Sequence, residues 1–420
     1  MLTFQIYEHS YKDKKYILDV KSKGKVESTK YFPVFENYDK EYIFKPLSKT
    51  KPLLTPLYAY SEVYWSYLIN KYIDNSTPRY RIATCKGLSD EQKKYQDKGT
   101  IVANVLGKDE KLINLLELYR KYPDSTVNID DYTNYCEVQY NYEDILNSTF
   151  FEMRKDLRAK LCLQILCSIL RRDANYHYEN VSFIEKDGKI VDIAPMIDME
   201  FSEMFLYPDK KEKHESRFSQ YDEGMSPIFD YDGKLSYEEN YELFKSRILD
   251  GSIYDRLDRY HFSNLLKNLR TIVKLHPEVV REFLRKISLM KHEIGEINIH
   301  FNREYIDTFS SDDYKLGIMK IKENKDESNT DYQKVQKEIK QVSIDEEEFN
   351  QRLKREVLWN IEKIEYVLHI LLDYYEGELL FPNEYSNETL YKPVKHVNED
   401  IMNLIFTNID KKYIKTDKDL

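Results

Sequence analysis

The chain has 420 residues and a formal net charge of −10, with 41% hydrophobic and 33% charged residues. This composition excludes a disordered chain, and the negative charge disfavours a non-specific grip on nucleic acid or on an anionic membrane. Neither a run of about 18 apolar residues nor a signal-peptide pattern occurs, so we expect a cytoplasmic protein. The four cysteines match no metal motif and are expected to be reduced and mostly buried.

The first hundred residues favour β-strands. Short runs rich in β-branched and aromatic residues predict strands at 15–20, 42–47, 79–84 and 99–106. One helix is predicted at 56–73, because apolar residues recur there at helical spacing from Leu57 to Tyr72. We therefore expect a small sheet with one long helix in this part of the chain.

From Lys108 onward the pattern becomes mostly helical. Helices are predicted at 109–122, 154–172, 237–249, 261–275, 277–294 and 346–377. Two short apolar runs joined by Asp187-Gly188 predict a β-hairpin at 181–195. The charged, weakly patterned segment 320–345 is expected to be a linker or a solvated helix.

A candidate phosphate site begins with Lys45, which stands in a predicted apolar strand where a buried ammonium requires a partner. Glu62 follows seventeen residues later in the predicted helix. In kinases a strand lysine that meets a helix glutamate holds the ATP phosphates; the alternative is an edge-strand lysine that faces water. Gly24 is a weaker candidate, because a turn at glycine can approach phosphates. An ordinary polar hairpin is the simpler interpretation of its surroundings.

The loop after the helix at 154–172 is dense in polar side chains. It contains Asp173 and Asn180, and Asp198 follows the predicted hairpin. Phosphoryl transfer needs such a set, with one carboxylate for the hydroxyl proton and an amide oxygen and a second carboxylate for Mg²⁺. A polar turn with a capping aspartate is one alternative. A metal-dependent hydrolase built on His177, Asp173 and Asp198 is another, disfavoured because HExxH and other close histidine pairs are missing.

The segments NYHYENVSFI and IVDIAPMIDMEFS, together with YIFKP and AYSEVYWSYLI, resemble the HipA-like serine/threonine kinases, a family of bacterial toxin kinases. The resemblance covers roughly residues 20–300 and is most specific at Lys45, His177, Asn180 and Asp198. It implies an α+β, two-lobed protein-kinase-like fold with a small β-rich lobe and a larger, mostly helical lobe. It also implies that Lys45 contacts ATP phosphates and that Asn180 and Asp198 bind Mg²⁺.

The chain departs from the family at the catalytic aspartate. Counting back from His177, the family pattern places that aspartate where this sequence has Asn175. An amide cannot accept a proton, although it can position a hydroxyl group or a water molecule. Either Asp173, two residues earlier, has become the base, or the chain is a pseudokinase that binds ATP without transferring phosphate. We favour Asp173 as the base.

The resemblance predicts an ATP- and Mg²⁺-dependent kinase that phosphorylates serine or threonine in a protein substrate, with the chain itself among the candidate substrates. An antitoxin or regulatory protein is the expected partner, whereas nucleic acid and membrane are not. The expected organisation is a nucleotide-binding lobe at 1–106, a catalytic lobe at 107–310 and a helical extension at 311–420 that completes that lobe. Gly99–Leu106 is the candidate adenine-binding hinge. An interaction protein that works through its helical half is the alternative from a different class.

Overall fold

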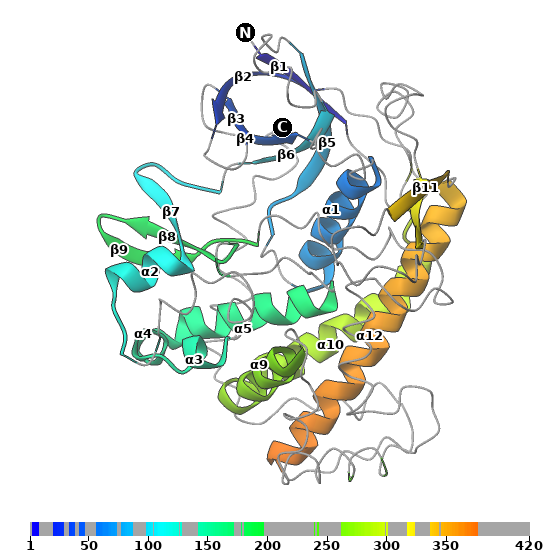
Figure 1. Cartoon of the computed structure of the whole chain (residues 1–420). Coiled ribbons are helices and arrows are strands. Elements are labelled where there is room, and N and C mark those ends of the chain that lie inside the picture. The colour runs from blue at the N-terminus through cyan, green and yellow to red at the C-terminus, as the bar shows by residue number, and fades with distance from the viewer. Residues whose placement is uncertain are drawn as a thin grey trace, which may run out of the picture.

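The structure is a computed structural model, and it describes residues 2–7, 20–28, 33–37, 42–46, 56–73, 77–86, 98–103, 105–125, 127, 142–171, 178, 180–196, 239, 242, 262–298, 300, 317–323, 337–343 and 346–376. These residues form small antiparallel sheets and a larger set of helices, an α+β arrangement as predicted. Figure 1 shows a barrel of strands at the top, a three-stranded sheet at the left and the long helices below.

Six antiparallel strands close into a barrel in the order β1-β2-β3-β4-β6-β5. Their bounds are Leu2–Tyr7 (β1), Val20–Ser28 (β2), Pro33–Asn37 (β3), Tyr42–Pro46 (β4), Tyr80–Lys86 (β5) and Lys98–Ala103 (β6). The pairing of β1 with β5 completes the ring, so the barrel has no open edge. The strands predicted at 42–47, 79–84 and 99–106 are confirmed as β4, β5 and β6. Of the segment 15–20 only Val20 is described, as the first residue of β2.

Helix α1 (Pro56–Leu68) continues into a five-residue π-helix, η1 (Ile69–Ile73), and packs against β5 and β6. Proline suits the first helical position, where its missing N–H is not needed. The end of η1 is fastened to α10 (Pro277–Glu293), because Lys286 Nζ donates to the carbonyl of Ile73 and Tyr72 Oη donates to Glu293 Oε2 at 2.8 Å. The predicted helix at 56–73 is therefore confirmed, and its C-terminal end is fixed to the helical part of the molecule.

A second sheet has the order β7-β8-β9, with β7 at Glu110–Asn114, β8 at Ser182–Lys186 and β9 at Lys189–Ile193. The predicted hairpin is confirmed. Asp187 (φ 49°) and Gly188 (φ 76°) both adopt the left-handed backbone that a two-residue hairpin turn requires.

The helix predicted at 109–122 is wrong over its first half. Residues 110–114 form β7, which supplies hydrogen-bonding partners to the edge of β8, and only α2 (Leu115–Lys121) is helical. A capping box sets the start of α2. The side chain of Asn114 accepts from the N–H of Glu117 (2.8 Å), and the Glu117 carboxylate accepts from the N–H of Asn114 (2.9 Å).

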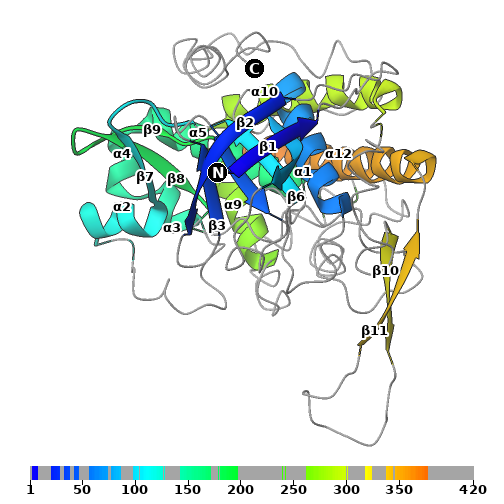
Figure 2. The ribbon, with the colours of Figure 1, turned by 90° about the horizontal axis from the view of Figure 1, so that it is seen from above.

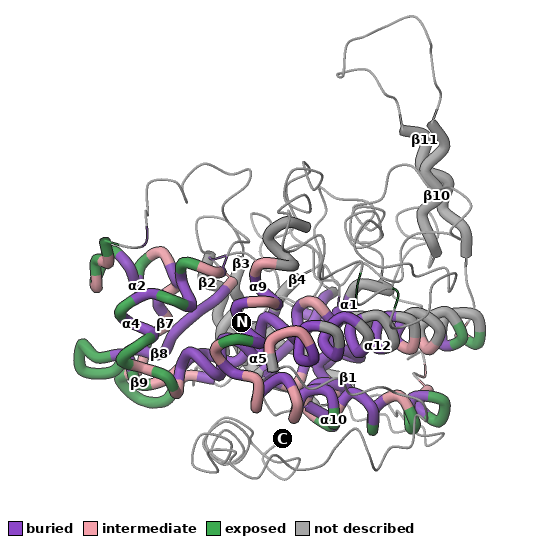
Figure 3. Tube along the Cα trace, turned by 90° about the horizontal axis from the view of Figure 1, so that it is seen from below, coloured by how far each residue is buried: buried purple, intermediate pink, exposed green. Residues whose placement is uncertain are grey.

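The helical body shares one apolar core with α1. It comprises α3 (Glu143–Leu146), α4 (Thr149–Met153), α5 (Lys155–Leu170), α9 (Phe262–Leu275), α10, the short 3₁₀ helix η6 (Ile294–Glu296) and α12 (Glu346–Glu376). Almost every residue of α5 is buried, including Cys162 and Cys167, and Figure 3 shows this burial along its length. The helices predicted at 154–172, 261–275, 277–294 and 346–377 are confirmed. Most of the segment 237–249 lies outside the described residues.

Helix α12 packs against α5, α9 and α10 and therefore belongs to the same helical body. The domain boundaries stay a prediction. The prediction that residues 320–345, before α12, form a linker or a solvated helix is wrong. This part of the chain contains two antiparallel strands, β10 (Gly317–Glu323) and β11 (Lys337–Ser343), which Figure 2 shows projecting away from the rest of the described chain. The many charged residues of both strands hid them from a pattern based on apolar residues, and only the pairing of the two strands reveals the hairpin. Within the described ranges, no helix combines the length and apolar character needed to cross a membrane.

Candidate active site

The barrel side of the site is centred on Glu62 of α1, whose carboxylate is buried with 1% exposure. The hydroxyl of Thr100 in β6, itself 2% exposed, donates to Glu62 Oε2 at 2.6 Å. A carboxylate withdrawn from water needs hydrogen bonds or a cation to offset the lost solvation. Glu62 is therefore held in a position where it could pair with a positively charged side chain.

Lys45 of β4 lies directly opposite Thr100 in the register between β4 and β6. Residues that face each other across an antiparallel pair share one side of the sheet. The register thus sets Lys45 next to the residue that contacts Glu62, which agrees with the expectation that the lysine and the glutamate act together. Their contact stays a prediction, because the side chain of Lys45 lies outside the described part of the chain.

The turn predicted at Gly24 is wrong. Gly24 lies inside β2, opposite Leu2 of β1 and Asn37 of β3, and the pairing on both sides keeps the backbone extended. A phosphate contact at Gly24 stays a prediction without that structural support. The candidate hinge Gly99–Leu106 covers most of β6 and continues beyond it toward β7. It therefore includes part of the segment that connects the barrel to the second sheet.

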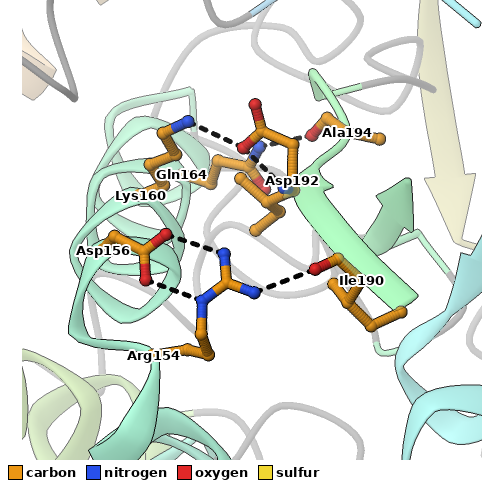
Figure 4. Close-up of polar contacts among 8 residues, drawn as sticks. Arg154, Asp156, Lys160, Gln164, Ile190, Asp192 and Ala194 are labelled. Carbon is orange, nitrogen blue, oxygen red and sulfur yellow. Dashed lines mark hydrogen bonds and ion pairs between the residues drawn. The ribbon is translucent and has the colours of Figure 1, made fainter. Parts of the chain in front are cut away.

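The other side of the site is organised by α5 and β9, which lie side by side. Three polar contacts join them, as Figure 4 shows: Arg154 Nη1 donates to the carbonyl of Ile190 (2.9 Å), Lys160 Nζ to Asp192 Oδ1 (2.7 Å) and Gln164 Nε2 to the carbonyl of Ala194 (2.7 Å). Along these contacts the helix advances about 15 Å and the strand about 13 Å. The two elements therefore run in the same direction and end on the same side of the molecule.

Arg154 is itself held by Asp156 through two hydrogen bonds of 2.9 and 2.8 Å (Figure 4). Burial alone would raise the pKa of Asp156, but the hydrogen bonds and charge of Arg154 outweigh it and hold that pKa below its usual value. Asp156 therefore stays ionised and keeps the guanidinium directed toward β9.

Both elements end shortly before a predicted site residue. Helix α5 ends at Leu170, three residues before Asp173, and β9 ends at Ile193, five residues before Asp198. Because the two ends lie on the same side, the chain leaves both in the same region. Asp173 and Asp198 themselves lie outside the described residues, as do Asn175 and His177.

Asn180 is described and half-buried, and it lies two residues before the start of β8. The N–H of Ala194 donates to the carbonyl of Ser182 at 2.7 Å. The chain leaving β9 is thereby fixed beside the chain entering β8, two residues after Asn180. Four further residues lead from Ala194 to Asp198, a reach of at most about 14 Å.

An amide and a carboxylate oxygen at this junction would suit Mg²⁺, which prefers hard oxygen ligands. Within the described ranges no group of three or more His, Cys, Asp or Glu side chains is arranged to hold a metal ion. Asn180 and Asp198 therefore remain the predicted pair, supported by the position of Asn180 beside the exit of β9.

Sequence reasoning missed Thr100, Lys160 and Gln164. A signal for two of them exists, because Lys160 and Gln164 are polar residues four positions apart in a helix with a broad apolar face, where burial demands partners. Thr100 carried no such signal, since threonine is common in strands.

No protein-family model and no curated protein matches this chain. Among solved structures, the chain is similar to the crystal structure of a proinflammatory kinase of Helicobacter pylori, CtkA. The identity is 13% and the TM-score 0.34, over 88% of this chain and 96% of that chain. A TM-score of this size does not establish a common fold, so the function has to be derived from the residues of this chain.

Proposed function

We propose that the chain is a kinase that uses ATP and Mg²⁺ to phosphorylate serine or threonine in a protein. The observation that carries the proposal is the arrangement around Thr100, which contacts Glu62 of α1 and lies opposite Lys45 in the sheet register. A helix carboxylate next to a strand lysine is how kinases hold the α- and β-phosphates. The parallel alignment of α5 and β9 adds support, because it brings together the chain ends that lead to Asp173 and Asp198.

Each residue has a distinct task in this proposal. Lys45 binds the phosphates and Glu62 orients its ammonium. Asn180 and Asp198 would hold Mg²⁺, which neutralises charge on the phosphates. Asp173 orients the substrate hydroxyl and accepts its proton.

The proposal includes a two-lobed organisation. The barrel with α1 forms the nucleotide-binding lobe at 1–106, and the remainder, with α12 included, forms the catalytic lobe. ATP binds between them, near the candidate hinge Gly99–Leu106. The reaction takes place in the cytoplasm, where ATP is supplied, and an antitoxin or regulatory protein is the proposed partner besides the substrate.

Incubation with labelled ATP and Mg²⁺ tests this function. Wild type should transfer label to itself or to a general protein substrate, and Lys45→Met should lose transfer together with ATP-induced thermal stabilisation. At a hundredfold excess over the dissociation constant that stabilisation amounts to about 2.7 kcal/mol. Lys25→Met, which removes a lysine from β2, is the control and should retain both. Absence of both transfer and stabilisation in wild type would favour the non-catalytic interaction protein.

The pseudokinase is the second candidate, and Asn175 is the observation that favours it. This alternative predicts that ATP stabilises the protein while no label is transferred.

A further inference from the structure

The C-terminal helix contacts the end of α5 at the point where the polar loop begins. Asn360 of α12 is 5% exposed, and its Nδ2 donates to the carbonyl of Leu170 at 3.2 Å. Leu170 is the last residue of α5 and is fully buried. The last four carbonyls of a helix lack partners within that helix. Asn360 therefore supplies, from 190 residues further along the chain, a hydrogen bond that the end of α5 cannot make for itself.

The position of Asn360 is well defined. Val357 and Ile361, on the same helix, are fully buried in the shared apolar core, and α12 packs directly on α5. An amide donor on such a fixed element restricts the direction in which the chain leaves α5. Arg171, the next residue, is also fully buried, and its N–H still bonds to the carbonyl of Cys167.

Asp173 lies only three positions after Leu170, so a change of direction at the helix end moves everything that follows. In an active site a displacement of about 1 Å can cost about a hundredfold in rate. We propose that Asn360 is a positioning residue for the loop that carries Asp173, which makes α12 part of the framework of the active site. This inference rests on the proposed kinase function for its effect on rate, but not for its effect on the loop.

The test compares two asparagines of α12. Asn350 is 6% exposed, and its Nδ2 donates within its own helix, to the carbonyl of Glu346 at 2.8 Å. Asn360→Leu and Asn350→Leu should therefore lower the unfolding temperature to a similar degree. Only Asn360→Leu should lower kcat, by about tenfold or more, with the KM for ATP unchanged. Asn360→Asp has the same shape but no donor and should behave like Asn360→Leu.

Hydrogen exchange of the peptide covering residues 171–180 provides a readout that needs no activity. It should be faster in Asn360→Leu than in Asn350→Leu, measured well below both unfolding temperatures. If wild type transfers no phosphate, the proposed kinase function fails while faster exchange in Asn360→Leu still supports the loop assignment. Equal exchange in the two variants would overturn that assignment, and so would equal kcat values in an active enzyme.

Discussion

The two halves of the candidate site are stabilised in different ways. On the barrel side, the Glu62 carboxylate accepts a hydrogen bond from Thr100, and both residues are buried. On the helical side, several polar contacts spread along α5 hold β9, and some of them are partly open to water. The barrel side should therefore respond strongly to a single substitution, whereas the helical side should tolerate the loss of one contact.

The two halves should also differ in function: the barrel side should act in ATP binding and the helical side in phosphate transfer. Asp173→Ala should lower the rate by about 10²–10⁴ while ATP still binds, because only the proton acceptor is lost. Rapid-mix kinetics and ATP titration of the same preparation measure both quantities. A variant that loses ATP binding as strongly as rate would show that the halves are not separable in this way.

Asn175→Asp sharpens the same point, because it restores the family pattern. If Asp173 is the base, the rate should stay unchanged or fall, since two neighbouring carboxylates repel and the pKa of one rises. If Asn175→Asp instead activates a silent protein, the natural chain is a pseudokinase.

Thr100→Val tests how strongly the barrel side depends on one bond. It removes the donor to Glu62 at nearly constant volume, so the free energy of unfolding should fall by about 1–3 kcal/mol. The KM for ATP should rise, because Glu62 loses a contact that holds it toward Lys45. Thr84→Val is the matched control: Thr84 lies in the neighbouring strand β5, is similarly buried, and should leave the KM unchanged. Thr100→Ser keeps the hydroxyl and should restore most of the ATP affinity.

The helical side is tested by combining substitutions. Lys160→Met and Gln164→Leu should each weaken Mg²⁺ affinity only modestly, because two of the three contacts still hold β9 in each single variant. The double variant should bind Mg²⁺ about 10–100-fold more weakly. Losses of this size are typical when residues that support metal ligands are replaced. Mg²⁺ titration of ATP binding measures this. Purely additive losses in a double-mutant cycle would contradict the idea that the contacts substitute for one another.

The smallest expected effect is the pH dependence of the Arg154–Asp156 pair. The pKa of Asp156 is lower in the folded protein than in the unfolded chain. The pair therefore stabilises the fold above about pH 4, the usual carboxylate range, and this contribution disappears as pH falls through the lowered folded pKa. Near neutral pH, the free energy of unfolding of wild type should exceed that of Arg154→Met by about 1 kcal/mol or less. Denaturant titrations below about pH 4 should show a smaller difference.

Sequence patterns predicted the elements whose signals are local. The Asp187-Gly188 turn and the long amphipathic helix α12 carry strong short-range signals, and both are confirmed. β7 was missed because its five residues also fit a helical pattern, and only the pairing with β8 decides between the two. The contacts of Thr100 with Glu62 and of Asn360 with Leu170 join residues far apart in the chain, so no local pattern reveals them. The assignment of the base to Asp173 stays a prediction.

The packing of α12 on α5 has a consequence for the timing of synthesis. A ribosome has added every proposed catalytic residue once it reaches Asp198, but α12 begins only at Glu346. Until then, the apolar surfaces of α5, α9 and α10 that α12 covers stay open, and Leu170 lacks its distant donor. A nascent chain thus carries the proposed catalytic residues before α12 has packed on α5. On the proposed function, phosphate transfer would begin only after α12 has been synthesised and has packed on α5.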